Sequence, residues 1–435
     1  MYRQTLYAGL LDYLLQFASD RKYPIINNLN FSSIGVSNKE LVAYITKYLK
    51  IPYIPYEHQI KAIKHAIQSN RCLLLSPTGS GKSLIIYVLA RYYLDQIPNN
   101  KKILVIVPTT GLVSQMTSDF SDYSKKDTWS SEDNCHNIFS GQSKNTEKRI
   151  VISTWQSIHN ENESFFSQFN CVFGDECHLF KAKSLTKIMT KLTECPYRFG
   201  TTGTLDDSQT HKLVVEGLFG RILNVTTTKT LMDKNLLSTL KIDCITLNYT
   251  PEDIQEIKRA KYIDELKWLI ANPKRNNFII NLTEKLEGNT LLLFNYVKDH
   301  GIPLYEEIKK RCKNKNIYMI HGGTDIDQRE RIRKILDEES NAVLVASYGT
   351  CSTGINVRNI NNIIFSSPSR SVIRVLQSIG RGLRKSKTKN KVKLYDISDD
   401  LRHLKYVNHT YRHLQERLKI YNKERFESKS IQIKI

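Results

Sequence analysis

A short glycine-rich segment between two apolar runs has the residue types that phosphate binding requires. It reads Ser76-Pro77-Thr78-Gly79-Ser80-Gly81-Lys82-Ser83 and separates apolar residues 72–75 from 84–86, an order that predicts a strand, a turn and a helix. Glycines let backbone N–H groups surround a phosphate, and a helix N-terminus adds positive potential. We expect a nucleotide here, with Lys82 at its β- and γ-phosphates and the Ser83 hydroxyl on Mg²⁺. The turn contributes Pro77, Thr78, Gly79, Ser80 and Gly81, although Ser76 replaces the usual first glycine.

Two adjacent carboxylates, Asp175 and Glu176, follow the largely apolar residues 170–174. At the end of a buried strand such a pair is unfavourable unless a cation lies nearby. We expect Asp175 to hold the Mg²⁺ shell and Glu176 to orient and deprotonate the attacking water. His178 is expected to point into the same cleft and to link the nucleotide state to the other half of the chain; a structural histidine is the alternative.

A third set of catalytic residue types, Gln377, Arg381 and Arg384, lies near the C-terminus. The two arginines are spaced to lie on one face of a helix. Guanidinium groups stabilise the charge that develops on a γ-phosphate. We therefore expect an arginine finger supplied by the opposite half of the chain. The alternative is a solvated basic start of a helix, because further lysines follow.

The charge of the chain favours a polyanionic partner. Its 64 Lys and Arg residues exceed its 43 Asp and Glu residues, which gives a net charge of +21. Basic side chains that neutralise phosphates release counterions, so nucleic acid is the expected partner. A surplus spread over all faces for solubility is the alternative.

Other compositional features narrow the class of protein. The eight cysteines include no C-x-x-C pair, so neither a zinc site nor a disulfide framework is indicated. Residues 1–22 carry charges throughout, and no apolar stretch is long enough to span a bilayer. We expect a reducing, cytoplasmic location and no membrane partner.

The 435 residues are too many for one ordinary core and predict several parts. Residues 1–50 form a short helical segment, with helices at 6–17 and, after a Ser37 cap, at 38–49. In each of two α/β domains, 51–235 and 236–400, strands alternate with helices, which predicts parallel sheets. The strands are expected at 72–75, 103–107, 150–153, 171–174, 198–201, 242–247, 289–294, 317–321, 342–346, 362–365 and 393–397. Residues 401–435 are expected to form a basic amphipathic helix packed on the second domain.

In this order the segments resemble a superfamily 2 helicase core with two RecA-like domains, from residue 59 to residue 384. Tyr56 and Gln59 are similar to the adenine-contacting Q motif. Residues 107–115 resemble motif Ia, and residues 153–157 resemble motif Ib/Ic. Residues 201–204 resemble motif III, residues 294–296 motif IV and residues 347–356 motif V. The resemblance implies ATP and Mg²⁺ as cofactors, with Gly354 near the nucleotide. It implies nucleic-acid contacts from Pro108, Thr109, Thr110, Gln115, Thr154, Trp155, Gln156, Asn295, Tyr296, His321, Gly322, Ser347 and Thr353.

Within that superfamily the motif sequences are most similar to those of the UvsW-type DNA helicases of tailed bacteriophages. Residues 106–116, 174–179, 346–356 and 376–385 carry the resemblance. It implies ATP-driven remodelling of branched DNA, including forks, Holliday junctions and R-loops, in recombination, repair and replication. That family has a larger N-terminal domain, whereas about fifty residues of a different character precede the Q motif here.

The expected substrates are single-stranded and branched DNA and RNA–DNA hybrids, in the host cytoplasm if the chain is phage-encoded. Single-stranded-DNA-binding or recombination proteins are candidate partners. Two alternatives stay open: an RNA helicase or RNA sensor, and an ATP-driven motor or annealing subunit of a larger complex. Core motifs contact the sugar-phosphate backbone in all of these classes, so they do not separate DNA from RNA.

Overall fold

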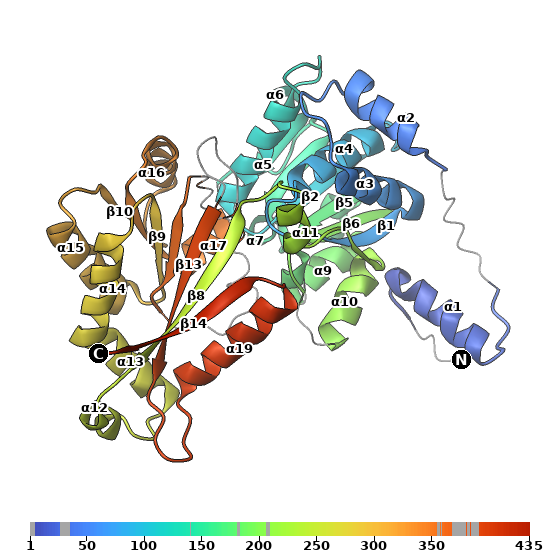
Figure 1. The fold of residues 1–435 in the computed structure, drawn as a ribbon. Helices are drawn as coiled ribbons and strands as arrows, with labels where there is room; N and C mark the ends of the chain where they lie inside the picture. The colour runs from blue at the N-terminus through green and yellow to red at the C-terminus, as the bar shows by residue number, and fades with distance from the viewer. Residues whose placement is uncertain are drawn as a thin grey trace. The chain divides into compact units, whose positions relative to one another are not determined.

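The computed structural model forms two compact units, Met1–Thr226 and Thr227–Ile435, each with its own seven-stranded sheet (Figure 1). The described residues are 5–26, 35–139, 141–180, 183–205, 209–354, 357, 359–367, 380, 383 and 391–435. The predicted catalytic residues Gln377, Arg381 and Arg384 lie outside them. The second unit begins at Thr227, so it includes residues 227–235, which the sequence analysis assigned to the first domain and which contain a helix at Thr228–Asp233.

The sheet of the first unit has the strand order β3-β4-β2-β5-β6-β1-β7, and its neighbouring strands are parallel. Its strands are β1 (Arg71–Leu75), β2 (Lys102–Val107), β3 (Cys135–Ile138), β4 (Ile150–Thr154), β5 (Phe169–Asp175), β6 (Tyr197–Thr202) and β7 (Ile222–Asn224). All five residues of β4 are buried, as expected for a parallel strand covered on both faces.

Helices cover both faces of this sheet. They are η1 (Ala8–Leu10), α1 (Leu11–Asp20), α2 (Asn38–Ala43), η2 (Tyr44–Tyr48), α3 (Glu57–Ser69), α4 (Lys82–Leu94), α5 (Thr110–Tyr123), α6 (Ser131–Asn134), α7 (Trp155–Ile158), α8 (Glu163–Phe166), η3 (Cys177–Leu179), α9 (Lys183–Lys191) and α10 (Gln209–Phe219). Leu74 and Val105 pack in one layer with α3, α4 and α5, whereas Leu73 and Leu104 pack in the other with α7 to α10. Alternate strand residues thus fill opposite layers.

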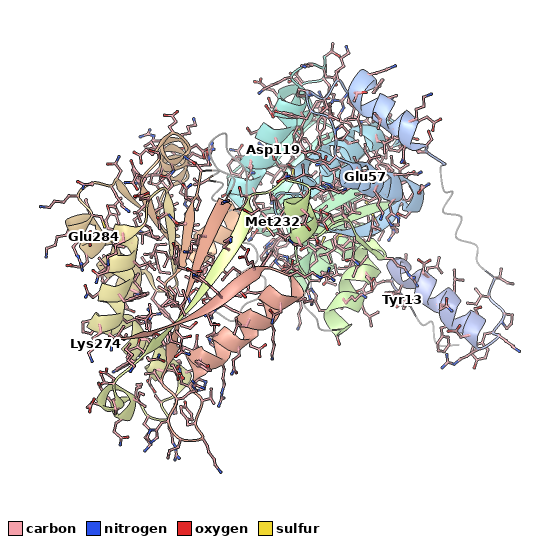
Figure 2. The ribbon with its side chains drawn as sticks, viewed as in Figure 1. Tyr13, Glu57, Asp119, Met232, Lys274 and Glu284 are labelled. Carbon is pink, nitrogen blue, oxygen red and sulfur yellow. The ribbon has the colours of Figure 1, made fainter. Side chains whose placement is uncertain are left out.

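The described part of the chain before residue 51 contains the helices η1, α1, α2 and η2. Ser37 caps α2 through a reciprocal pair of hydrogen bonds with Glu40. Figure 2 shows Tyr13 on α1. Its hydroxyl donates a hydrogen bond to Glu216 Oε2 at 2.8 Å. A Cβ at Gly9 would lie 2.0 Å from the Glu216 carbonyl oxygen, so this glycine allows the N-terminal segment to pack closely on α10.

The second unit repeats the architecture with the strand order β10-β11-β9-β12-β13-β8-β14, again parallel. Its strands are β8 (Thr239–Asn248), β9 (Thr290–Phe294), β10 (Ile317–Ile320), β11 (Val343–Ser347), β12 (Asn362–Phe365), β13 (Lys391–Asp400) and β14 (Glu427–Lys434). Its helices are α11 (Thr228–Asp233), α12 (Pro251–Glu256), α13 (Tyr262–Ala271), α14 (Pro273–Lys285), η4 (Val297–Gly301), α15 (Ile302–Arg311), α16 (Ile326–Glu338), α17 (Tyr348–Gly354) and α19 (His409–Lys423).

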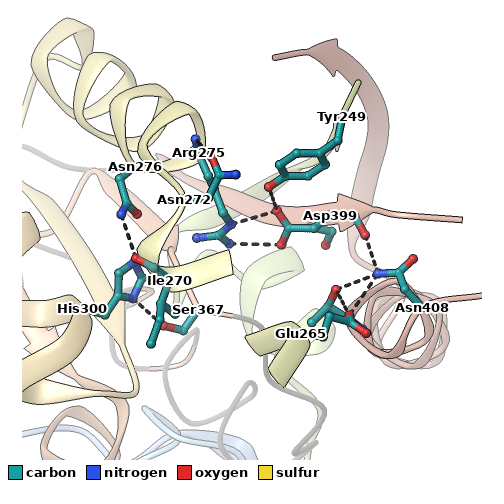
Figure 3. Close-up of polar contacts among 12 residues, drawn as sticks. Tyr249, Glu265, Ile270, Asn272, Arg275, Asn276, His300, Ser367, Asp399 and Asn408 are labelled. Carbon is teal, nitrogen blue, oxygen red and sulfur yellow. Dashed lines mark hydrogen bonds and ion pairs between the residues drawn. The ribbon is translucent and has the colours of Figure 1, made fainter. Parts of the chain in front are cut away.

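A buried polar network ties the helices of the second unit to its sheet (Figure 3). Arg275 on α14 donates to Asp399 at the end of β13, with Nε–Oδ1 and Nη2–Oδ2 distances of 2.8 and 3.2 Å. Both side chains are fully buried, and the Tyr249 hydroxyl also donates to Asp399. Asn408 joins Asp399 to Glu265 on α13. Because a buried charge is tolerated only when it is paired, these bonds fix α13 and α14 on the sheet.

The structure corrects the single helix predicted over residues 401–435. The helix is α19, which begins at His409 and packs Leu414 and Tyr421 into the core. The following residues form β14, which pairs with β8 at the edge of the sheet. Its alternating Ile431 and Ile433 are a strand pattern that the helical interpretation overlooked. In the part of the chain that the structure describes, no helix has the length and apolar character for crossing a bilayer.

Candidate functional site

The glycine-rich segment forms the predicted turn between β1 and α4. Gly79 and Gly81 both have φ near +84°, a conformation that side chains rarely adopt, and Gly81 is the N-cap of α4. Lys82 is the first residue of that helix, and its Nζ donates to the Ser76 carbonyl oxygen at 3.2 Å. Ser80 is buried and donates to the Pro77 carbonyl oxygen at 2.7 Å. The turn therefore has the shape and the donors of a phosphate cradle.

The predicted adenine-contacting segment lies directly against this turn. Gln59 Nε2 donates to the Ser80 carbonyl oxygen at 3.1 Å, and Gln59 Oε1 accepts from the Tyr56 backbone N–H at 2.8 Å. His58 Nε2 lies 2.9 Å from the same Ser80 oxygen, a contact that the sequence analysis did not predict. The Tyr56 ring is exposed and stacks on His58 with centroids 5.7 Å apart. Tyr56 is thus available to a planar ligand, and Gln59 supports the turn.

The acidic pair lies at the carboxyl end of β5. Asp175 Oδ1 accepts from the Thr201 hydroxyl at 2.7 Å. Burial, followed by the neighbouring Glu176 carboxylate, raises the pKa of Asp175, whereas Lys82 opposes that rise. A bound cation would remove this unfavourable burial of negative charge. The Ser83 hydroxyl and the Asp175 carboxylate are hard oxygen ligands of the kind that Mg²⁺ prefers, so the residues fit the implied metal.

Glu176 and His178 are joined through the next strand of the sheet. Glu176 adopts a left-handed backbone with φ of 54°, which is strained for a non-glycine residue and is often found at functional positions. His178 is buried, and its Nδ1 lies 3.3 Å from Glu176 Oε2 and 3.0 Å from Thr202 Oγ1. His178 therefore connects the acidic pair to motif III within the first unit. Its predicted link to the other half of the chain stays a prediction.

Motif III in turn lies against the phosphate turn. The Ser76 backbone N–H donates to the Thr202 carbonyl oxygen at 2.9 Å. A Cβ at Gly203 would lie 3.6 Å from the Thr78 nitrogen and 3.7 Å from Lys82 Nζ. Because β5, β6 and β1 are neighbours, the three segments that follow them meet at one edge of the sheet.

Two further predicted segments of the first unit lie along the same edge. Pro108, Thr109 and Thr110 follow β2, where the Thr109 hydroxyl caps α5 by accepting from the Leu112 N–H. Thr154 is the last residue of β4 and pairs in register with Val107. The remaining candidates on this edge are Gln115 within α5, and Trp155 and Gln156 at the start of α7. Since the strand order is β4-β2-β5-β6-β1, the candidate nucleic-acid segments adjoin the candidate nucleotide segments.

The candidate nucleic-acid residues of the second unit follow three neighbouring strands, β10, β11 and β9. His321 and Gly322 follow β10, and their carbonyl oxygens accept from Arg329. Ser347 ends β11, and its hydroxyl lies 2.7 Å from Thr350 Oγ1. The last candidates are Asn295 and Tyr296 after β9, and Thr353 and Gly354 at the end of α17. The predicted residues of this unit therefore share one edge of its sheet.

Comparison with known proteins identifies both units. Residues 53–207 match the family described as "Type III restriction enzyme, res subunit", and residues 274–386 match "Helicase conserved C-terminal domain". The chain resembles the solved structure of Mss116p bound to single-stranded RNA and AMP-PNP in fold, with 14% identity, a TM-score of 0.62, and coverage of 94% of this chain and 81% of that one. The crystal structure of T4 UvsW matches with 30% identity and a TM-score of 0.46 over 99% of this chain and 88% of that chain.

A curated relative covers most of the chain. The ATP-dependent DNA helicase UvsW of Enterobacteria phage T4 is 34% identical over 389 residues, which is 86% of this chain and 76% of the relative. The matched region contains the phosphate turn, the acidic pair and the segments at the carboxyl edges of both sheets. This chain belongs to the UvsW family of ATP-dependent DNA helicases.

Proposed function

We propose that this helicase moves along one DNA strand and remodels branched DNA, including forks, Holliday junctions and R-loops. The order of segments along the first sheet carries this proposal. Candidate DNA contacts follow β4 and β2, and candidate nucleotide contacts follow β5, β6 and β1. One rigid sheet therefore supports both groups. The net charge of +21 supports a polyanionic partner.

ATP hydrolysis is assigned to the first unit. Backbone N–H groups of residues 78–81 and the Lys82 ammonium bind the phosphates. When bound, Mg²⁺ would offset phosphate charge, held by the Ser83 hydroxyl and the Asp175 carboxylate. Glu176 orients the attacking water and accepts its proton, and contacts with Thr202 and His178 hold its carboxylate in place.

DNA is held through its backbone. Hydroxyls and backbone N–H groups at the strand ends, together with the exposed Tyr296 ring, are suited to phosphates, sugars and stacked bases rather than to a base sequence. Binding is therefore expected to be independent of sequence.

The roles of the catalytic arginines, the outer domain bounds, the location and the partners are proposed from the sequence. Arg381 and Arg384, with Gln377, stabilise the γ-phosphate charge during hydrolysis. The two helicase domains lie within residues 51–400, with their boundary at Thr227, where the second compact unit begins. The chain acts in the cytoplasm of a host cell, with RNA–DNA hybrids as further substrates and single-stranded-DNA-binding or recombination proteins as partners.

A labelled model fork tests the proposal. Two arms with homologous ends regress into two duplexes only if the branch point is moved, and a dye pair on one parental and one nascent strand reports this step. We expect product with ATP, none with a non-hydrolysable analogue, and none with Lys82→Ala. Product from an RNA duplex but not from the DNA fork would favour the RNA helicase alternative. DNA-stimulated hydrolysis without strand displacement would favour the motor-subunit alternative.

A further inference from the structure

One tyrosine connects the expected metal ligand of the phosphate turn to the helix that begins at the candidate DNA loop. The Tyr123 hydroxyl lies 2.9 Å from Ser83 Oγ. Tyr123 is the last residue of α5, whereas Thr109 caps the first turn of the same helix. The two ends of α5 therefore contact the two candidate sites of the first unit.

The surrounding side chains hold the Tyr123 ring in place. Its ring centroid lies 5.5 Å from that of the buried Tyr87 and 6.2 Å from that of Tyr53. Tyr87 accepts a hydrogen bond from Arg91 at 2.8 Å, and Tyr53 donates to Asp122, the residue before Tyr123, at 2.5 Å. Aromatic packing on two sides leaves the phenol ring little rotational freedom, so the position of its hydroxyl is set by the fold.

The contact between Tyr123 and Ser83 can orient the Ser83 hydroxyl as a metal ligand. A hydroxyl that binds a cation through an oxygen lone pair keeps its proton, and that proton needs an acceptor. Tyr123 Oη is placed to accept it, which turns the lone pairs of Ser83 toward the ion. Without this hydrogen bond, the Ser83 hydroxyl would rotate and would have to be ordered each time Mg²⁺ binds.

We propose that Tyr123 is a positioning residue that orients the Ser83 hydroxyl for Mg²⁺ and couples it, through α5, to DNA held at residues 108–110. This inference rests on the proposed function of both sites. Helix α5 has 14 residues and so spans about 21 Å. Val113, Met116 and Phe120 pack in the core along the length of the helix. Because α5 is one continuous helix, a displacement at its first turn moves its last residue as well. Such coupling must be reciprocal: DNA tightens metal–nucleotide binding by the factor by which metal–nucleotide tightens DNA binding.

Tyr123→Phe tests the positioning role, because it removes only the hydroxyl. Binding of a fluorescent ATP analogue is titrated at increasing Mg²⁺ and again in EDTA. We expect the apparent Kd for Mg²⁺ to rise about 2- to 13-fold, the range for one neutral hydrogen bond, and binding in EDTA to stay unchanged. Tyr87→Phe is the matched control, since it removes the hydroxyl of the neighbouring tyrosine and leaves the contact between Tyr123 and Ser83 in place.

A second substitution separates positioning from folding. On a Ser83→Ala background, Tyr123→Phe should have no further effect on Mg²⁺ binding, because the partner is already gone. An unchanged Mg²⁺ titration in Tyr123→Phe, or equal losses in Tyr87→Phe, would overturn the positioning role.

The coupling is measured by repeating the titration with saturating single-stranded DNA, read by anisotropy of a labelled strand. The factor by which DNA tightens Mg²⁺–nucleotide binding should fall toward one in Tyr123→Phe. The same factor in Tyr123→Phe and in the parent chain would overturn the coupling while leaving the proposed function intact. A parent chain that binds neither nucleotide nor DNA would instead contradict the proposed function.

Discussion

Replacing Gly81 by alanine should weaken ATP binding for two separable structural reasons. The backbone at Gly81 has φ of 84°, and the new Cβ would lie only 2.2 Å from Gln59 Nε2. Alanine in this conformation costs about 1–2 kcal/mol. Gln59 must also move away from the Ser80 carbonyl oxygen, which costs about 0.5–1.5 kcal/mol for one lost hydrogen bond. The sum is about 1.5–3.5 kcal/mol, or about a 10- to 300-fold weaker Kd.

A cycle of variants distinguishes the two causes. ATP affinity is measured with a fluorescent analogue for Gly81→Ala, Gln59→Ala and the double variant, and urea unfolding checks that each one folds. The double variant has no side chain for the new methyl group to displace. Relative to Gln59→Ala it should therefore lose only the backbone part, about 5- to 30-fold. Affinity of Gly81→Ala within threefold of the parent, or strictly additive losses in the double variant, would refute this reasoning.

Three other substitutions test the acidic pair and the buried network of the second unit. Glu176→Gln should lower kcat for phosphate release about 10²- to 10⁴-fold with ATP binding retained, and an unchanged kcat would exclude Glu176 as the base. Arg275→Met leaves the buried Asp399 carboxylate without its guanidinium, so urea unfolding should show a loss of about 3–5 kcal/mol; a loss below about 1 kcal/mol would contradict the importance of the pair. Burial and then Arg275 lower the pKa of His300 to about 3. Between that pKa and about 6.5, only the unfolded chain binds the proton. Lowering the pH from 6.5 to 5 should therefore decrease the free energy of unfolding by about 2 kcal/mol. His300→Gln should lack this contribution in urea titrations at both pH values, and an identical pH slope would argue against it.

Much of the fold could be predicted because its central strands are continuous apolar runs. The five strands predicted in the first unit are present with small shifts of their ends, as in β2, expected at 103–107 and found at Lys102–Val107. Such runs bounded by turn residues indicate buried parallel strands. The chemical motifs follow these strands directly in the sequence. Their convergence on one sheet edge therefore follows from the parallel arrangement alone.

The elements that the sequence did not predict are edge strands. β3 has the sequence Cys-His-Asn-Ile, β7 has only three residues, and β14 carries charged and polar side chains on its exposed positions. Edge strands are short or polar because an apolar open edge promotes association. The hydrophobic pattern that indicates a strand is therefore weakest in these edge strands. The pairing of β14 with β8 also depends on contacts between residues that are distant in the sequence.

The supporting residues of the site show the same limit. His58 adjoins Gln59, so its contact with the phosphate turn could have been considered from position alone. The contact of Tyr123 with Ser83 spans 40 residues, and no motif or spacing points to it. Only the packing of α5 on α4 brings the two hydroxyls together.

The rate of ATP hydrolysis in the presence of different nucleic acids tests the central claim most directly. The parent chain and Lys82→Ala are compared with no nucleic acid, single-stranded DNA, branched DNA and RNA at matched nucleotide concentration. We predict strong stimulation by DNA, greatest with branched DNA, and no hydrolysis above background in Lys82→Ala. Hydrolysis that is indifferent to every nucleic acid, or that persists in Lys82→Ala, would contradict the account.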